Sequence, residues 1–319
     1  MSTYRENQGY RIKKVDTDPA NPKEGQIWYN NISKQIKVRI VVPAAWASGG
    51  NLNTGRAGLG GAGIQTAALA FGGSTPSLNE TEEYNGSSWS EQNNLNTGRF
   101  YGAGFGIQTA AVMAGGIVNT TDNRNLNSSE EYNGTSWSEG NNLNTGRDLL
   151  SGAGTLTAGL CFGGSASSAN VKNTEEYDGT SWSEQNDLST AVRASSRAGI
   201  QTSALSFCGD SGSATNQTEE YDGTSWSSGG NYPLNTEAGA GSSGPQTAAL
   251  GFGGYTTSST NVYDGSSWTA TASMATARGG LNGDGTNATS AIAFGGAPSR
   301  NITEEFTDTA FSTKTVDVS

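Results

Sequence analysis

The sequence contains no histidine, and it has only two cysteines, seven prolines and three methionines among 319 residues. Without histidine the chain cannot build a Ser–His–Asp or Cys–His nucleophile, nor a histidine-ligated metal site. Two cysteines, Cys161 and Cys208, are too few to staple a chain of this length. We therefore expect both thiols to be unpaired and buried, and we predict neither a disulfide framework nor a metal site.

Branched and aromatic apolar residues are also scarce. Leu, Ile, Val and Phe together make up 47 residues, about 15%, whereas the 46 glycines are about twice the usual share. The net charge of −11 is modest for this length, so the composition fits either a low-complexity chain or an unusual all-β fold. No apolar run is long enough for a transmembrane helix, and residues 1–14 have no apolar signal core. We expect neither membrane insertion nor secretion.

A repeat of about 44 residues decides between these alternatives. Five copies end in the pattern Tyr-Asn/Asp-Gly-Ser/Thr-Ser-Trp, and a sixth, degenerate copy has phenylalanine at both aromatic positions. The copies are Tyr84–Trp89, Tyr132–Trp137, Tyr177–Trp182, Tyr221–Trp226, Tyr263–Trp268 and Phe306–Phe311. Such regular self-similarity is typical of solenoids and propellers rather than of disordered chains.

Two further features recur upstream of each aromatic pair. The first is a glycine pair at the end of a run of small residues: Gly72-Gly73, Gly115-Gly116, Gly163-Gly164, Gly253-Gly254 and Gly295-Gly296, with Gly209-Asp210 in the fourth copy. The second is an arginine, namely Arg56, Arg99, Arg147, Arg193 and Arg278, which is replaced by Glu237 in the fifth copy. The fifth copy also lacks the Glu-Glu dipeptide found before the other tyrosines, so we predict that the arginine and a glutamate pair structurally.

The spacing predicts four antiparallel strands in each copy. The Asn-Gly and Asp-Gly dipeptides predict type I′ hairpin turns between the Tyr strand and the Trp strand. Four strands in about 44 residues is the size of a propeller blade, and small residues suit strands that crowd around an axis. We therefore predict an all-β, six-bladed β-propeller over residues 47–319. Seven blades remain an alternative, in which residues 26–40, Trp46 and Lys314–Val318 form the seventh.

The glycine pair followed by spaced Tyr and Trp resembles the Kelch repeat over roughly residues 47–319. The repeat sequences Leu-Asn-Thr-Gly-Arg and Thr-Glu-Glu-Tyr-Asp-Gly-Thr-Ser-Trp are similar to those of Kelch-type virion and tail-fibre-like structural proteins of marine bacteriophages. The segment Asp18–Asn30 is similar to an N-terminal part of such proteins. The resemblance implies a Kelch-like propeller in a virion, present in multiple copies, without a cofactor.

Three functions follow from this resemblance as expectations. The first is a non-enzymatic, tail-fibre-like, receptor-binding protein, and the second is a capsid or tail decoration protein. A polysaccharide hydrolase is the third, because acidic residues are plentiful. The Kelch-like copper radical oxidases require histidine ligands, which this chain lacks. Asn282–Asn287 resembles a calcium loop, but the closing glutamate of an EF-hand is absent.

Residues 1–46 form a basic arm. They contain eight Lys/Arg and four acidic residues, whereas residues 47–319 contain ten basic and 25 acidic ones. Alternating segments at 26–30 and 35–42 predict a β-hairpin. We expect residues 1–35 to bind other virion proteins, and the candidate contact residues are Arg11, Lys13, Lys14, Trp28 and Tyr29. Packing of the arm on its own acidic propeller is the alternative. Nucleic-acid binding is not expected from an acidic protein.

The loops after the glycine pairs vary in length, and in an antiparallel meander they all emerge on one face. Variable loops gathered on one face mark a binding surface. The longest is Ile117–Ser129, whose candidate ligand-binding residues are Asn119, Asp122, Asn123, Arg124 and Asn125. Their amide and charged groups suit a host surface glycan or protein. The alternative is a solvated loop without function.

Overall fold

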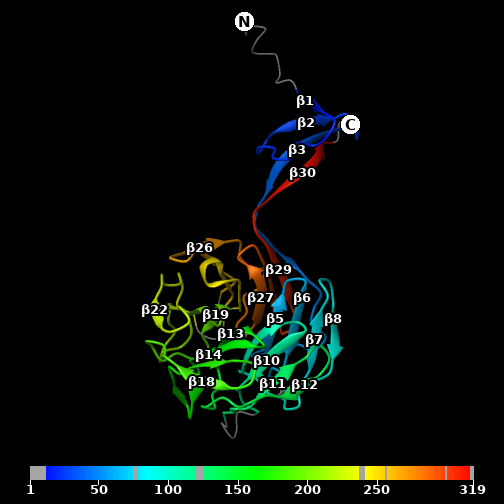
Figure 1. Ribbon diagram of the computed structural model, residues 1–319. Coiled ribbons are helices and arrows are strands. Elements are labelled where there is room, and N and C mark those ends of the chain that lie inside the picture. Colours follow the sequence, from blue (N-terminus) through cyan, green and yellow to red (C-terminus); the bar gives the residue numbers. More distant parts are fainter. Residues whose placement is uncertain are drawn as a thin grey trace. The chain divides into compact units, whose positions relative to one another are not determined.

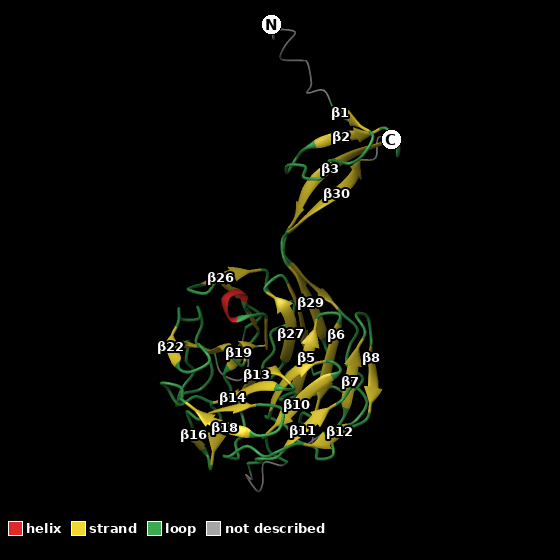
Figure 2. Ribbon diagram, in the orientation of Figure 1, coloured by secondary structure: helices red, strands yellow, loops and turns green. Residues whose placement is uncertain are grey.

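The computed structural model describes residues 12–74, 78–118, 125–236, 241–255, 257–298 and 300–316. Almost all regular structure in these ranges is β-strand, and one short 3-10 helix, η1 (Gln246–Ala248), interrupts it (Figure 2). The predicted all-β class is therefore confirmed. The chain divides into two compact units, Met1–Ala44 with Asp308–Ser319 and Ala45–Thr307. We call them the arm unit and the repeat unit.

The repeat unit contains six four-stranded antiparallel sheets in the described residues (Figure 1). Sheet 1 comprises β5 (Gly60–Ile64), β6 (Ala67–Phe71), β7 (Thr81–Tyr84) and β8 (Trp89–Gln92). Sheet 2 comprises β9 (Ala103–Ile107), β10 (Ala110–Ala114), β11 (Ser129–Tyr132) and β12 (Trp137–Glu139). Sheet 3 comprises β13 (Ser151–Thr155), β14 (Ala158–Phe162), β17 (Thr174–Tyr177) and β18 (Trp182–Gln185), with a β15 (Ser165–Ala166) and β16 (Ala169–Asn170) ribbon inserted.

The other three sheets repeat this order. Sheet 4 comprises β19 (Ser196–Ile200), β20 (Ser203–Phe207), β21 (Thr218–Tyr221) and β22 (Trp226–Ser228). Sheet 5 comprises β23 (Gly241–Ser243), β24 (Leu250–Phe252), β25 (Thr260–Tyr263) and β26 (Trp268–Thr271). Sheet 6 comprises β27 (Asn282–Asn287), β28 (Ser290–Phe294), β29 (Thr303–Thr307) and β4 (Ala45–Ser48). The predicted four strands per copy are confirmed for the first five copies, whereas the sixth copy supplies three strands of its sheet.

Sheet 6 takes its outer strand from the other end of the unit. Trp46 on β4 is in register with Phe306 on β29, just as Trp89 is with Tyr84 in sheet 1. The prediction that Phe311 holds the tryptophan position is therefore wrong. Phe311 lies on β30 (Ala310–Val316), whose partner is β3 in the arm unit. The compact units divide between residues 44 and 45 rather than between the predicted 46 and 47, and residues 308–319 belong to the arm unit.

The arm unit is a sheet of β1 (Lys13–Val15), β2 (Ile27–Asn30), β3 (Gln35–Val42) and β30. The predicted hairpin is confirmed, because β2 and β3 pair antiparallel from Ile27–Val38 to Asn30–Gln35. Strands from both ends of the chain thus share one sheet, as the seven-blade alternative supposed. That sheet lies in a separate compact unit, however, and Trp46 is not part of it.

The first strands of neighbouring sheets contact one another. β5 contacts β9, β9 contacts β13, β13 contacts β19, β19 contacts β23, β23 contacts β27, and β27 contacts β5. The contacts thus pass once through all six sheets and return to the first. Glycine and alanine dominate these strands, and a Cβ at Gly104 would lie 2.6 Å from the backbone nitrogen of Gly61 on the neighbouring strand. The strands can approach one another this closely only because few of their residues have branched side chains.

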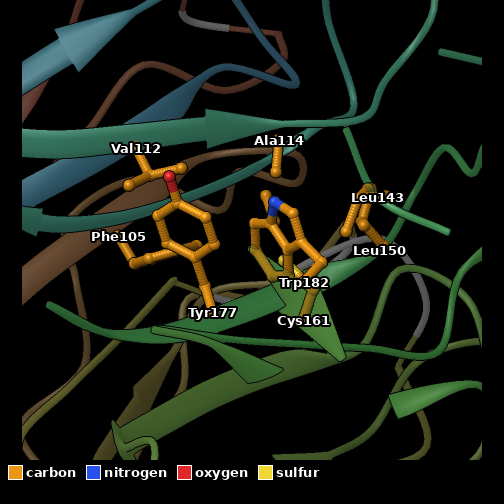
Figure 3. Packing of buried hydrophobic residues seen from close by; sticks show 9 residues of the cluster. Phe105, Val112, Ala114, Leu143, Leu150, Cys161, Tyr177 and Trp182 are labelled. Atoms are coloured by element: carbon orange, nitrogen blue, oxygen red, sulfur yellow. The ribbon is translucent and has the colours of Figure 1, made fainter. Parts of the chain in front are cut away.

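The core is divided among the sheet interfaces. One cluster joins Phe105, Val112 and Ala114 of sheet 2 to Cys161, Tyr177 and Trp182 of sheet 3 (Figure 3). Tyr177 and Trp182 stack with ring centroids 4.7 Å apart. Each sheet therefore buries its aromatic residues against a neighbour, as expected for repeats that cannot fold alone. Cys161 and Cys208 are unpaired and buried, as predicted.

The turns between the Tyr and Trp strands differ from the predicted type I′. Only the glycine of each turn has a positive φ, between 86° and 92°. The preceding Asn or Asp instead accepts hydrogen bonds through its side chain: Asn85 Oδ1 accepts from the backbone nitrogens of Ser87 and Ser88, each at 3.0 Å. A type I′ turn needs two residues with positive φ. The side-chain hydrogen bonds make the second one unnecessary.

Candidate functional site

Most of the recurrent arginines are structural rather than part of a binding surface. Four of them make buried salt bridges with the first glutamate of the Glu-Glu dipeptide in their own sheet: Arg56–Glu82 at 2.9 Å, Arg99–Glu130 at 2.8 Å, Arg147–Glu175 at 2.8 Å and Arg278–Glu304 at 3.0 Å. All eight side chains are at most 3% exposed. The predicted pairing is confirmed for these four copies. These arginines tie the loop before the first strand to the third strand.

The fourth copy breaks the arginine pattern. The backbone nitrogen of Gly164 bonds to the carbonyl of Val192, as that of Gly116 does to Arg147. Val192 therefore holds the arginine position, and the assignment of Arg193 to it is wrong by one residue. Arg193 pairs instead with Asp210 at 2.6 Å. The predicted glycine pair is shifted as well, because Cys208, with a φ of 60°, occupies the place of the first glycine.

The second glutamate of each dipeptide connects neighbouring sheets. It accepts a hydrogen bond from the tyrosine of the following sheet, as in Tyr132 to Glu83 and Tyr221 to Glu176, both at 3.0 Å. The other pairs are Tyr84–Glu305, Tyr177–Glu131 and Tyr263–Glu220. Burial and the adjacent carboxylate raise the pKa of Tyr84 and Tyr263 to about 12. The repeated polar residues are thus used to hold the sheets together.

The predicted glycan loop is described only in part. Asn119, Asp122, Asn123 and Arg124 lie outside the described residues. Asn125 is described, and its side-chain amide donates to the carbonyl of Ser165 and, at 3.4 Å, to Asp148 Oδ1. Asn125 therefore attaches its loop to the neighbouring sheet.

The predicted contact residues of the arm occupy different environments. Arg11 lies outside the described residues, Lys13 and Lys14 are exposed on β1, and Tyr29 is half-buried. Trp28 is 0% exposed, and its indole nitrogen donates to Asp18 Oδ1 at 2.9 Å. The structure therefore corrects the role predicted for Trp28: it is a core residue of the arm unit, because a fully buried indole cannot contact a partner.

A cavity in the described residues lies where the chain enters the first strands. Its volume is about 430 Å³. It is lined by the segments immediately before and at the start of β5, β9, β13, β19 and β27, together with residues of the loops after the glycine pairs. This is the face on which the loops of variable length were expected. The cavity is therefore accessible from the side predicted to bind a ligand.

Five equivalent residues form a collar around this cavity: Gly58, Tyr101, Leu149, Ala194 and Gly280. All five have positive φ, between 51° and 61°. Their backbones are hydrogen-bonded in series, with Gly58 N–H donating to Gly280, Tyr101 to Gly58, Leu149 to Tyr101 and Ala194 to Leu149, at 2.7–2.8 Å. Left-handed backbone is unfavourable for non-glycine residues and often occurs at ligand sites. The collar thus holds three non-glycine residues, Tyr101, Leu149 and Ala194, in an unfavourable backbone conformation.

Tyr101 projects over the neighbouring collar residue. A Cβ at Gly58 would lie 2.5 Å from Cε1 of the Tyr101 ring, so glycine is required there. Burial raises the pKa of the Tyr101 hydroxyl. The exposed Tyr255 also lines the cavity. Two tyrosines therefore contribute flat apolar surface and hydroxyl groups to this cavity.

Arg197 also lines the cavity, and with Asp284 it forms a charge pair that breaks the repeat. Arg197 stands where four of the other first strands have glycine: Gly61, Gly104, Gly152 and Gly283. Its Nη2 donates to the carbonyl of Gly104 at 2.8 Å and lies 3.9 Å from Asp284 Oδ1. Both residues also line a second cavity of about 120 Å³. Burial raises the pKa of Asp284 to about 7, and Arg197 opposes this shift.

The charged and aromatic residues that line the cavity lie at positions where the other copies of the repeat have different residues. Arg193, Arg197, Arg300, Tyr101 and Tyr255 all line it, and none recurs at its equivalent positions. Only Arg193 was predicted from the sequence to have a role, and that role was pairing with a glutamate. The available signal was each residue's difference from the other copies, whereas a repeat motif is defined by what the copies share.

No protein-family model matches this chain, and no curated protein matches it. In the part of the chain that the structure describes, no group of three or more His, Cys, Asp or Glu residues is placed to hold a metal ion. Within the same residues, no helix is long and apolar enough to cross a membrane.

Proposed function

We propose that the repeat unit is a six-bladed Kelch-like β-propeller that serves as a non-enzymatic binding module of a bacteriophage virion. In this proposal each four-stranded sheet is one blade, and β4 completes the sixth. The contacts that return from β27 to β5 support a closed ring of blades. The viral assignment is supported by the resemblance of the repeat sequences to those of tail-fibre-like phage proteins.

One observation carries the binding function. The residues that recur are used in links within and between sheets, whereas the residues that do not recur meet in one cavity on the face with variable loops. A scaffold needs the first set, and recognition of a particular ligand needs the second. We therefore assign host-surface recognition to this face of the repeat unit.

The arm unit supplies attachment to other virion proteins in this proposal. It has its own sheet, and Asp18 accepts hydrogen bonds from Trp28, Asn30 and Lys37 at 2.6–2.9 Å. Lys13 and Lys14 are exposed on its edge strand β1. Exposed basic side chains suit an acidic surface on a partner. A decoration protein without receptor binding is the second candidate, because a separate arm unit serves attachment alone equally well.

The proposal is tested with the purified full chain and surface polysaccharides of candidate host bacteria. Binding without shortening of the polysaccharide, measured by co-sedimentation and by size-exclusion chromatography, is the expected result. Shortening would contradict the non-enzymatic assignment. Absence of binding, together with antibody labelling of phage particles in electron micrographs, would favour the decoration protein.

A further inference from the structure

The arginines of the acidic repeat unit are distributed unevenly. Its residues, 45–307, include 23 acidic and only nine basic ones. Seven arginines of the repeat unit are described, and four of them make the buried pairs with glutamates, while Arg193 pairs with Asp210 and Arg197 lies 3.9 Å from Asp284. The other three, Arg193, Arg197 and Arg300, all line the 430 Å³ cavity. Cationic side chains gathered in one concave site of an acidic protein indicate an anionic ligand.

The three guanidinium groups are held at different places in the cavity. Arg193 is 39% exposed in its side chain and is oriented by Asp210. Arg300 Nη1 donates to the carbonyl of Ser74 at 3.0 Å, which fixes it in the loop region. Arg197 lies beside Gly104. Guanidinium groups fixed in this way are suited to carboxylates, which they bind through paired hydrogen bonds.

The remaining lining groups point to more than a simple anion. Asp210 and the Ser74 hydroxyl, which donates to the carbonyl of Ala57 at 3.1 Å, also line the cavity and can accept hydrogen bonds. Tyr255 is 54% exposed and offers an aromatic face at the cavity. An inorganic anion such as phosphate has no apolar face for Tyr255. A sugar ring has both hydroxyl donors and an apolar face, and the cavity volume is in the range of small-molecule sites.

We propose that this cavity binds a carboxylate-bearing sugar residue of a surface polysaccharide. The carboxylate lies against the arginines, the sugar hydroxyls bond to Asp210 and its polar neighbours, and the ring face lies on Tyr255. This inference rests on the proposed function, whose ligand class it specifies. It places recognition in the cavity rather than in the long loop predicted from the sequence.

The test uses the full chain and three probes: glucuronic acid, glucose and inorganic phosphate. Glucuronic acid and glucose differ chiefly in the carboxylate, so their comparison isolates the arginines. We expect glucuronic acid to bind about tenfold more tightly than either other probe, measured by ligand-detected NMR titration. Arg300→Gln is expected to weaken glucuronic acid binding about tenfold, and Tyr255→Ala to weaken it to a smaller extent.

Lys172→Gln is the matched control, since it removes one positive charge from the same unit at a residue that does not line the cavity. It is expected to leave binding unchanged, and thermal unfolding of each variant checks that it is folded. Equal binding of glucuronic acid and glucose, equal binding of phosphate, no binding of glucuronic acid, or unchanged binding in Arg300→Gln would each overturn the inference.

The two proposals fail separately. If the chain binds host polysaccharide and Arg300→Gln binds it equally well, the proposed function stands and the cavity is not the site. If glucuronic acid binds in the cavity but no host polysaccharide is bound, the cavity inference stands and host recognition is wrong.

Discussion

Tyr132 in sheet 2 donates its hydroxyl proton to Glu83 in sheet 1, across an interface between two repeats, at 3.0 Å. Five of the six sheet interfaces have this bond. At the remaining interface the tyrosine position holds Phe306 and the glutamate position holds Val262. Donor and acceptor are thus lost together, which leaves no unpaired carboxylate in the interface.

Tyr132→Phe is expected to lower the free energy of unfolding by about 2 kcal/mol, since it removes one hydrogen bond to a charged group and leaves Glu83 without its donor. Urea denaturation followed by tryptophan fluorescence measures the change. Phe306→Tyr is the reciprocal control, because its new hydroxyl would stand opposite Val262 and should bring no gain. An unchanged midpoint in Tyr132→Phe would show that this bond does not hold the sheets together.

Alkaline pH should weaken the same interfaces. Burial raises the pKa of Tyr84 and Tyr263 to about 12, above the ordinary value of 10. Because the folded state retains these protons more strongly than the unfolded chain does, the stabilisation is complete below pH 10 and is lost as the pH rises toward 12. Thermal unfolding between pH 9 and pH 12 checks this fall. A flat melting temperature over that range would contradict it.

The buried Arg–Glu pairs allow a comparison within one molecule. Glu130 accepts from the backbone nitrogens of Asn96 and Thr97 and pairs with Arg99. In sheet 4, Glu219 accepts from the equivalent backbone nitrogens of Ser189 and Thr190, while Val192 stands at the arginine position.

Glu130→Gln is expected to cost about 3 kcal/mol or more, because it leaves a buried guanidinium without its counter-charge. Glu219→Gln leaves no such charge behind and should cost clearly less. Chemical denaturation of both variants gives the two values. Equal costs would mean that the backbone hydrogen bonds, and not the ion pair, dominate at both positions.

The strands of the repeat unit could largely be predicted from the sequence because each copy has the same residues at the same spacings. Fixed spacings placed the strands, and the joint loss of arginine and glutamate in the fifth copy indicated their pairing. The register of the fourth copy was misjudged, although Leu188 lies four residues before Val192 just as Leu52 lies before Arg56. Following the buried leucine rather than the charge would have placed Val192 correctly.

Other features depend on contacts that no local pattern records. Trp46 precedes Leu52 by the same distance as Trp89 precedes Leu95, which marks it as a tryptophan of the repeat, but β4 and β29 are separated by most of the chain, so this spacing did not identify Phe306 as its partner. The cavity was missed because Tyr101, Arg197 and Tyr255 are single departures from their repeats, and only the fold brings them together.

Trp46→Ala tests how sheet 6 is completed. The Trp46 ring lies 4.9 Å from Phe252 and its indole nitrogen donates to Thr260 at 3.0 Å, both in sheet 5. The variant should lower the free energy of unfolding by about 3 kcal/mol through lost packing. Trp268→Ala, at the equivalent half-buried position of a sheet that is continuous in sequence, is the matched control. A negligible effect of Trp46→Ala beside a large one for Trp268→Ala would argue against closure through β4.

Asp284 should make stability depend on pH near neutrality. Its pKa is raised to about 7 by burial, and its Oδ2 atom has no hydrogen-bond partner. The folded state therefore binds this proton more tightly than the unfolded chain, whose aspartate titrates near pH 4. The free energy of unfolding should fall as the pH rises from about 4 to about 7 and then level off.

Asp284→Asn removes this titration, so its stability relative to the unaltered chain should be greater at pH 8 than at pH 5. Denaturation midpoints at the two pH values measure the difference. Asp264→Asn is the control, because backbone hydrogen bonds lower the pKa of that exposed turn residue to about 2 and its titration is complete below pH 5. If Asp284→Asn and the unaltered chain change in parallel between pH 5 and pH 8, Asp284 is already ionised at pH 5, and the Arg197 pair outweighs the cost of its burial.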